Sequence, residues 1–317
     1  VRISNFEGDL RDCRAFAAAL VSYIPSLASR FDPQKDGGLV LTPANAIDLE
    51  RNATLVLDAM REYGLEARTT PRELLEHSAR DNLLFTSFLY NTLPQYVPKT
   101  TVKFKGKLLE TITKTIELTN PTKYAIDYTV SLDGCEDFRP SDSKLHLDPK
   151  ASGTFAISIK PRFTRKVEGR VMFLSGRGGT MSAATMVFAL ETEVDHDSAL
   201  KTIDTIETAM YEPVTHDVLI ENPFPTNGHF AVSVIQEYIK PATGKPFPEE
   251  ESLHHFPDAF WTPTDTVSLK KGDRAKFSLQ FLPCVRGRFR ARVVFKDDKV
   301  GEFAYVFVGN CLPPKPS

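Results

Sequence analysis

The chain has 317 residues, of which 41% are hydrophobic and 25% are charged, and its formal net charge is −2 at pH 7. These proportions are typical of globular proteins, and no apolar run approaches the ~20 residues that span a bilayer. The near-zero charge provides no general attraction to nucleic acid or anionic lipid. The length predicts two or three domains, at ~100–200 residues each. The first residues carry charges throughout and do not resemble a secretory signal. Because the sequence starts at Val1 without a methionine, we expect a fragment of a longer protein.

Residues 1–98 have the three- and four-residue apolar spacing of helices. The pattern predicts helices at 9–24, 45–64, 69–79 and 80–93. Gly64 occupies a position typical of a helix C-terminal cap. Thr70, Pro71 and Glu73 predict a capped helix start, because Thr and Glu three residues apart form a capping box and Pro suits the first helical position.

Beyond Pro98 the apolar period changes to two residues, which is typical of strands. The residues expected on one face of their strands are Tyr124, Ile126, Tyr128 and Val130 in one segment, and Phe155, Ile157 and Ile159 in another. Turn residues separate these segments, and no helical pattern lies between them. The second part of the chain is therefore predicted to form antiparallel β sandwiches.

An internal repeat divides the β region. Residues 145–173 align without a gap on residues 267–295, so that Phe155 matches Phe277 and Phe173 matches Phe295. An Asn-Pro pair ends a strand upstream in both copies, and the second copy carries an insertion at 240–264. A repeat of this length indicates two copies of one domain. The predicted domains are a helical domain at 1–98, a first sandwich at 99–195 and a second sandwich at 196–317.

Four arginines alternate with smaller or apolar residues in the second copy, namely Arg286, Arg288, Arg290 and Arg292. Period-two alternation places their guanidinium groups on one strand face, opposite Phe289 and Val293. Our first interpretation is a solvated face, since arginines on a strand also discourage pairing with other strands. The alternative is a binding surface for an acidic partner. A nucleic-acid site is less favoured, because no aromatic residues interleave on that face.

The insertion at 240–264 combines five prolines with exposed-looking aromatic residues, namely Phe247, Phe256, Phe260 and Trp261. Large aromatic side chains are costly to leave in water. One interpretation is a lid folded over the edge of its own sandwich. The alternative is an aromatic anchor for a partner protein, for which we select Phe256, Phe260 and Trp261.

Motifs with catalytic chemistry are weak in this sequence. The glycine-rich stretch 175–180 lacks the Lys of a phosphate-binding loop and is predicted to be a hairpin. His254 and His255 are adjacent and would point apart in an extended segment, so we expect no metal site there. Cys13 lies among apolar helix positions and is predicted to be a core residue, and all cysteines are expected to be reduced thiols. We expect neither an enzyme nor a cofactor.

The helical segment resembles a calponin-homology domain. In residues 5–25 a Phe precedes an Arg-Asp pair, an apolar helix and Pro25, as in the second conserved block of that family, and residues 45–65 and 85–90 resemble its later helices. Leu10 and Cys13 stand where the family favours Trp and Gly. The family's first helix has no counterpart. The resemblance implies an all-α, N-terminally truncated domain, and it does not carry actin binding over.

The two β domains resemble immunoglobulin-like sandwiches of the ASH and major-sperm-protein type. The resemblance rests on the Ile-x-Leu-x-Asn-Pro-Thr strand at 116–122 and the Phe-x-Ile-x-Ile-x-Pro strand at 155–161. Together with a calponin-homology domain, they resemble large structural proteins of the axoneme of cilia and flagella. That resemblance implies a cytoplasmic, cytoskeletal protein of the axoneme, most simply of its central-pair apparatus. It implies axonemal proteins as partners, tubulin as a further candidate, and no membrane or nucleic acid.

Two alternative functions stay open at this stage. A sandwich of the major-sperm-protein type is expected to act as an adaptor at membrane contacts if it grips an acidic peptide. Convergence of Lys160, Arg162, Arg165, Lys166 and Arg170 on one concave patch would favour that function. Crosslinking of actin through the helical domain is the second alternative.

Overall fold

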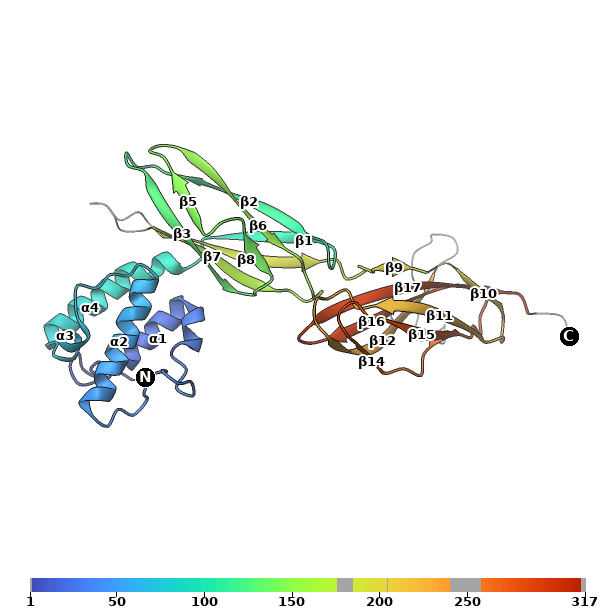
Figure 1. Cartoon of the computed structure of the whole chain (residues 1–317), viewed down its shortest axis with the longest axis horizontal. Helices are drawn as coiled ribbons and strands as arrows, with labels where there is room; N and C mark the ends of the chain where they lie inside the picture. Colours follow the sequence, from blue (N-terminus) through green and yellow to red (C-terminus); the bar gives the residue numbers. More distant parts are fainter. Residues whose placement is uncertain (1, 176–184, 204, 240–257, 315–317) are drawn as a thin grey trace. The chain divides into compact units, whose positions relative to one another are not determined.

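The chain is described by a computed structural model over residues 2–175, 185–203, 205–239 and 258–314. Its internal contacts divide it into two compact units. The first unit comprises 1–104, 112–159 and 167–192, and the second comprises 105–111, 160–166 and 193–317. The first unit contains the helices and one β sandwich, and the second contains another β sandwich (Figure 1). The structure is mostly β, as predicted for the region beyond Pro98.

The helical part contains α1 (Arg14–Tyr23), α2 (Ala46–Glu62), α3 (Pro71–Leu75) and α4 (Ala79–Thr92). Two short 3₁₀ helices, η1 (Pro25–Ser29) and η2 (Leu93–Tyr96), follow α1 and α4. The predicted capping box at α3 is confirmed: the Glu73 amide donates to the Thr70 hydroxyl, and the Thr70 amide donates to the Glu73 carboxylate at 2.9 Å. Ser78 and Asp81 form the same motif at α4. Each box satisfies amide donors that the first helical turn leaves unpaired.

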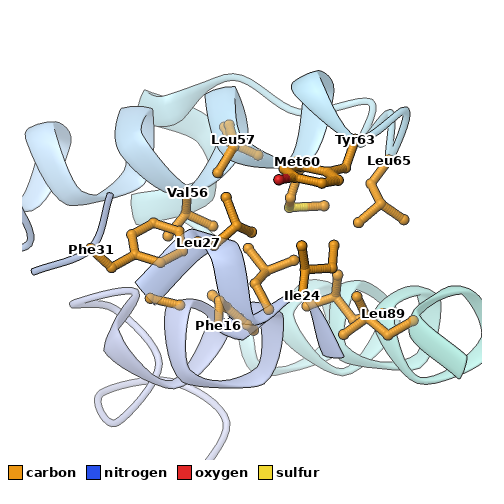
Figure 2. Packing of buried hydrophobic residues seen from close by; sticks show 14 of the residues in the cluster. Phe16, Ile24, Leu27, Phe31, Val56, Leu57, Met60, Tyr63, Leu65 and Leu89 are labelled. Atoms are coloured by element: carbon orange, nitrogen blue, oxygen red, sulfur yellow. The ribbon is translucent and has the colours of Figure 1, made fainter. Parts of the chain in front are cut away.

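One buried cluster joins these helices. Figure 2 shows Phe16 of α1, Val56 and Met60 of α2 and Leu89 of α4 turned toward one another. Helix α1 starts later than predicted because Cys13 adopts a left-handed conformation, with φ of 60°, just before it. Its side chain is nevertheless fully buried in this cluster. The prediction that Cys13 is a core residue is therefore confirmed.

The first sandwich contains the strands β1 (Thr100–Gly106), β2 (Ile112–Thr119), β3 (Ile126–Gly134), β4 (Phe138–Pro140), β5 (Lys144–Leu147), β6 (Ser152–Ile159), β7 (Glu168–Ser175) and β8 (Met186–Val194). Within the described residues, one sheet has the order β1-β8-β7-β3-β5 and the other β2-β6-β4. Phe104, Phe155 and Phe173 lie in the core between them. Tyr124 precedes β3 and is 63% exposed, so the prediction that it shares a strand face with Ile126 and Tyr128 is wrong.

The second sandwich contains the strands β9 (Lys201–Thr202), β10 (Ile206–Ala209), β11 (Val214–Glu221), β12 (Gly228–Ile239), β13 (Phe260–Trp261), β14 (Thr266–Leu269), β15 (Arg274–Phe281), β16 (Gly287–Asp297) and β17 (Gly301–Leu312). In the described part of the chain, its sheets have the orders β10-β17-β16-β12-β14 and β11-β15-β13, and β9 also pairs with β17. Phe277, Phe295 and Phe303 lie fully or almost fully buried between these sheets.

The two sandwiches share one strand plan, as the repeat predicts. The strands β2, β6 and β4 of one copy correspond to β11, β15 and β13 of the other, with the same pairing order. The aligned phenylalanines Phe155 and Phe277 are each 2% exposed, and Phe173 and Phe295 are both fully buried. The repeat therefore encodes the same core twice.

Candidate functional site

The predicted arginine face lies on β16, near the centre of its sheet. Phe289, Ala291 and Val293 point into the core, with exposures of 3%, 0% and 0%, so the predicted alternation is confirmed. Arg288 is exposed on the opposite face, whereas Arg290 and Arg292 are half-buried there. Arg286 is exposed just before the strand. The four arginines are therefore not equivalent.

Arg290 and Arg292 contact acidic side chains and a backbone carbonyl on this face. The Arg290 guanidinium lies 3.9 Å from the Asp197 carboxylate and 3.8 Å from that of Glu237, its neighbour on β12. Arg292 donates to the Ser198 carbonyl at 3.4 Å. The segment that holds Asp197 and Ser198 continues into β9, which runs along β17. Two arginines thus hold this segment against their own sheet.

Burial removes part of the solvent around Arg292. Burial lowers the pKa of its guanidinium, and the nearby Asp197 carboxylate opposes that effect. In the described structure its Nε is buried without a hydrogen-bond partner, and so is Oε2 of Glu237. A small cavity of about 40 Å³ lies on this face and is lined by Arg290, Arg292, Glu237, Ile235 and Asp197. Space and unused hydrogen-bonding capacity therefore occur together on this face.

The equivalent face of the first sandwich has a different role. Met172 and Leu174 of β7 are buried in the same cluster as the helices, and Arg170 donates to the Tyr23 carbonyl at 3.1 Å. In the second copy Ile235 is 52% exposed, and Lys296 replaces Leu174 in the alignment. The apolar run of β7 is the sequence signal of a strand buried on both faces, which alternation alone does not reveal.

The aromatic candidates of the insertion are divided between the core and the surface. Phe260 is 3% exposed and stacks on Phe281 with the ring centroids 4.6 Å apart. Trp261 follows on β13 and is 56% exposed. Its ring lies on the outer face of the sheet, since Phe260 occupies the inner one. Phe256 and Phe247 lie outside the described residues, as do His254, His255 and most of the glycine-rich stretch.

The helical part contains a cleft of ≈ 390 Å³ at the start of α4. Phe85, Phe88 and Leu84 supply its apolar wall, and His77 lies among them with its Nε2 3.2 Å from the Thr69 hydroxyl. Glu66, Arg68 and Asp81 also line the cleft, so it combines an apolar wall with charged side chains and one imidazole.

The thiol of Cys13 lies in the core of the helical part. Burial, followed by the nearby Asp12, raises the pKa of Cys13 to about 12, which keeps the thiol protonated and unreactive. All four cysteines are free thiols, as expected. Among the residues that the structure describes, no group of three or more His, Cys, Asp or Glu side chains is placed to hold a metal ion. Likewise, no helix of the described chain is long and apolar enough to cross a membrane.

Several of the basic residues expected to grip an acidic peptide have contacts within their own unit. In the second unit Arg162 donates to the Val300 carbonyl at 3.1 Å, and Arg165 lies over the Phe163 ring at 4.5 Å. In the first unit Arg170 donates to the Tyr23 carbonyl at 3.1 Å. The convergence of these residues on one concave patch stays a prediction.

Comparison with known proteins now gives these surfaces a context. The chain resembles cilia- and flagella-associated protein 47. It is 22% identical to the mouse protein and 24% identical to the human protein, over 99% of this chain in both cases. The chain spans 11% of the length of each of these relatives. It is also 27% identical to fimbrin of Dictyostelium discoideum over 97 residues, which are 31% of this chain and 14% of fimbrin. No family model matches the chain.

Solved structures similar to parts of the chain include the ASH/PapD-like domain 7 of human CEP192, which covers 35% of this chain and 82% of that domain at 18% identity, with a TM-score of 0.27. Another is SSP-19, a major-sperm-protein-like protein of Caenorhabditis elegans, which covers 29% of this chain and 94% of its own at 15% identity, with a TM-score of 0.24. Because these scores are low, the description of the two sandwiches depends on their strand pairing.

Proposed function

We propose that this chain is a segment of a non-catalytic structural protein of the axoneme of cilia and flagella. The observation that carries the proposal is the similarity to cilia- and flagella-associated protein 47 in two mammals along 99% of the chain. That similarity covers the helices and both sandwiches. It therefore extends to the order of these modules along the chain as well as to a single fold. In this proposal the protein is located in the cytoplasm, in the cytoskeleton of the cilium.

The finer parts of the proposal are the central-pair apparatus as the location and a calponin-homology domain as the identity of the helical part. The second is supported by the resemblance of residues 5–25, 45–65 and 85–90 and by the helices observed there. In this proposal the protein contacts other axonemal proteins, and tubulin is a further candidate partner. The segment acts without a cofactor, as one part of a large assembly.

A scaffold needs rigid modules with side chains left over for partners, and the second unit has both. Its core is dense in aromatic rings, for example Phe295 and Phe303, which stack with centroids 4.9 Å apart. Trp261 and Ile235 remain more than half exposed on its two opposite sheets. Exposed aromatic and aliphatic groups of this kind commonly anchor protein interfaces.

The proposal is tested by locating the protein that contains this chain in ciliated cells. A fluorescent or immunogold tag is expected along the axoneme, resistant to detergent removal of the membrane, and concentrated at the central pair. The double variant Trp261→Ala/Arg288→Ala is expected to fold and to be retained less well after detergent. The matched control Tyr211→Ala/Lys271→Ala changes an exposed aromatic and an exposed cation elsewhere in the same unit.

Three outcomes would count against the proposal. Loss of the tag with the membrane fraction would favour the adaptor at membrane contacts. Exclusive co-sedimentation with actin filaments, and not with axonemes, would favour actin crosslinking. A location on the axoneme but away from the central pair would remove only the finer assignment.

A further inference from the structure

Strand β11 forms an edge of the second sandwich. All eight of its residues, Val214–Glu221, pair with β15, and in the part of the chain that the structure describes it pairs with no other strand. The Glu221 amide already donates to the Tyr305 hydroxyl at 3.3 Å. At ~3.4 Å per residue, the other side of the remaining residues, 214–220, presents a row of backbone groups about 24 Å long. Such an edge is a template for an added strand unless side chains block it.

The outward side chains of β11 combine an apolar centre with two acids. Leu219 is 64% exposed and lies two residues from both Asp217 and Glu221, so all three share one face. Lys276 and Arg274 of β15 each lie 2.8 Å from one of these carboxylates. The Ser278 hydroxyl also donates to Asp217 at 2.5 Å. Both carboxylate side chains nevertheless stay about half exposed, at 45% for Asp217 and 48% for Glu221, so each can meet a second cation. Leu219 therefore lies exposed between two carboxylates, each paired with a cation of β15 and still open to solvent.

The first copy provides an internal comparison for the inward-facing positions. Lys114 of β2 is paired with Ile157, and His216 of β11 is paired with Leu279, the residue aligned with Ile157. Lys114 therefore directs a charged, exposed side chain toward the core side of its edge, which is an established way to prevent strand addition. His216 instead packs its ring against Phe307, with centroids 6.2 Å apart. The blocking charge is absent from β11.

The outward-facing side chains of the two edges show the same contrast: charged on β2 and apolar on β11. Glu117 of β2 pairs with Thr154, and Leu219 of β11 pairs with Lys276, which is aligned with Thr154. The first copy therefore has a charge where the second copy has an exposed leucine. The β2 edge therefore carries a charge at both compared positions, Lys114 and Glu117. The β11 edge carries His216 and Leu219 there and lacks both charges.

We propose that β11 binds an extended segment of a partner protein as an additional strand. The recognised segment has a central apolar residue opposite Leu219, flanked two residues away on both sides by Lys or Arg opposite Asp217 and Glu221. Backbone hydrogen bonds supply most of the affinity, and the side chains at alternate positions supply the specificity. This inference rests on the proposed scaffold function for its biological meaning, but its test is carried out in solution and does not depend on location in the cell.

The test uses the full chain and a synthetic peptide, acetyl-TKVLVKT-amide. Because its central sequence is a palindrome, the peptide places a lysine opposite each acid in either strand direction. We expect hydrogen exchange of the amides of 214–221 to slow by about tenfold when the free peptide is at about ten times its Kd. Protection is expected to be confined to β11 and the loops next to it.

Two control peptides separate strand pairing from charge attraction. The peptide TKVPVKT keeps both lysines but cannot continue a strand ladder through proline, and TEVLVET keeps the strand pattern but reverses the charges. Neither is expected to protect 214–221. Equal protection by TKVPVKT would overturn the proposal, because binding would then be electrostatic only.

Protein variants exchange the edge residues of the two copies. His216→Lys/Leu219→Glu gives β11 the side chains of β2 with no net change in formal charge, and we expect peptide affinity to fall at least tenfold. The matched control Lys114→His/Glu117→Leu leaves β11 intact and is expected to retain the protection of 214–221. Unchanged affinity in the first variant would overturn the proposal. So would protection of 214–221 that rises with protein concentration alone, since the occupant would then be a second copy of this chain.

Discussion

Asn120 and Asn222 explain the two Asn-Pro pairs that mark the repeat. The Asn120 side-chain amide donates to the carbonyls of Tyr124, Leu147 and Asp148 at 2.7, 3.1 and 3.0 Å. Asn222 donates in the same way to Thr226, Leu269 and Lys270 at 2.8, 3.3 and 3.1 Å. Both residues are buried, at 0% and 3% exposure. Each asparagine therefore joins the end of one strand to the loop after another.

Replacing either asparagine by alanine leaves several buried carbonyl oxygens without donors. We expect Asn120→Ala and Asn222→Ala each to lower the free energy of unfolding of its own unit by about 2–4 kcal/mol. Urea denaturation followed by hydrogen exchange distinguishes the units, and the single tryptophan, Trp261, reports on the second. Asn91→Ala at an exposed helix position is the control, with an expected change within about 0.5 kcal/mol. An equally small effect at Asn222 would contradict this role.

His146 on β5 gives the first sandwich a local dependence on pH. Its Nδ1 lies 2.6 Å from Asp127 and its Nε2 lies 3.4 Å from Asp148. Hydrogen bonding to Asp127, and then to Asp148, raises the pKa of His146 above its usual value. Because the folded-state pKa is raised, the stabilisation is complete below the unfolded pKa of about 6.5 and is lost as pH rises through the folded-state value.

Asp127→Asn is therefore expected to lower the pKa of His146, as measured by an NMR titration of its ring protons. The stability difference between the wild-type chain and this variant should be larger at about pH 5.5 than at a pH above the raised folded-state pKa of His146. Asp137→Asn removes a carboxylate elsewhere in the same sandwich and serves as the control. A His146 pKa that is identical in Asp127→Asn and the wild type would exclude the ion pair in solution.

At the scale of elements, the start of β16 depends on a glycine. Gly287 has a φ of +141°, and an added Cβ would lie 2.3 Å from the Tyr238 hydroxyl. That hydroxyl donates to the Arg286 carbonyl at 2.9 Å and holds the turn before the strand. The position thus excludes a side chain by backbone conformation and by lack of space.

We expect Gly287→Ala to destabilise the second unit by about 3 kcal/mol, from backbone strain and displacement of Tyr238. Gly272→Ala separates the two causes, because Gly272 has a φ of +70° but no atom within 4 Å of an added Cβ. Its expected cost is about 1–2 kcal/mol, from conformation alone. Denaturation monitored by Trp261 fluorescence measures both. Equal costs would show that Tyr238 moves away without penalty.

Local patterns in the sequence predict most of the elements, since capping and alternation are properties of neighbouring residues. The box of Thr70 and Glu73 and the strand of Phe155 are examples. Tyr124 shows the limit: it continues the alternation of β3, but Asn120 accepts hydrogen bonds from Thr122 and turns the chain before the strand begins. A contact between a buried side chain and a turn is not visible as a periodic pattern.

The candidate sites could be predicted only in part, for a similar reason. Alternation correctly separates Arg288 from Phe289, but it does not show that Asp197 pairs with Arg290 from 93 positions earlier in the chain. It likewise cannot distinguish Phe260 from Trp261, because composition marks both as aromatic and only pairing with Phe281 decides which one faces the core. Long-range contacts therefore determine which of the predicted residues remain accessible.

At the scale of the whole molecule, the repeat conserves the interior and varies the surface. Aligned core positions such as Ile157 and Leu279 are both buried, whereas aligned surface positions differ: Leu174 contacts the helical cluster and Lys296 is exposed. Duplication thus provides the same framework twice, and substitutions on its faces and edges give each copy its own contacts. A scaffold that joins different partners requires this difference between the copies.

The second unit also includes two segments from the sequence of the first sandwich, 105–111 and 160–166. The Leu108 amide donates to the Ser198 hydroxyl at 3.1 Å, and the Glu302 amide donates to the Arg162 carbonyl at 2.8 Å. Arg162 in turn donates to the Val300 carbonyl at 3.1 Å. Residues 196–317 are therefore an incomplete version of this unit.

A fragment of residues 196–317 is expected to unfold at lower urea concentration than the same sandwich in the full chain. Such a fragment loses five hydrogen bonds that the structure shows between these segments and residues 196–317. At ~0.5–1.5 kcal/mol each, their loss predicts a decrease of about 2.5–7.5 kcal/mol in the free energy of unfolding. Trp261 fluorescence reports on this unit in both proteins. Arg162→Ala in the full chain removes the side-chain hydrogen bonds to the Lys299 and Val300 carbonyls and is expected to cost about 1–3 kcal/mol. A fragment as stable as the full-chain sandwich would show that the two segments are held by the second unit without stabilising it.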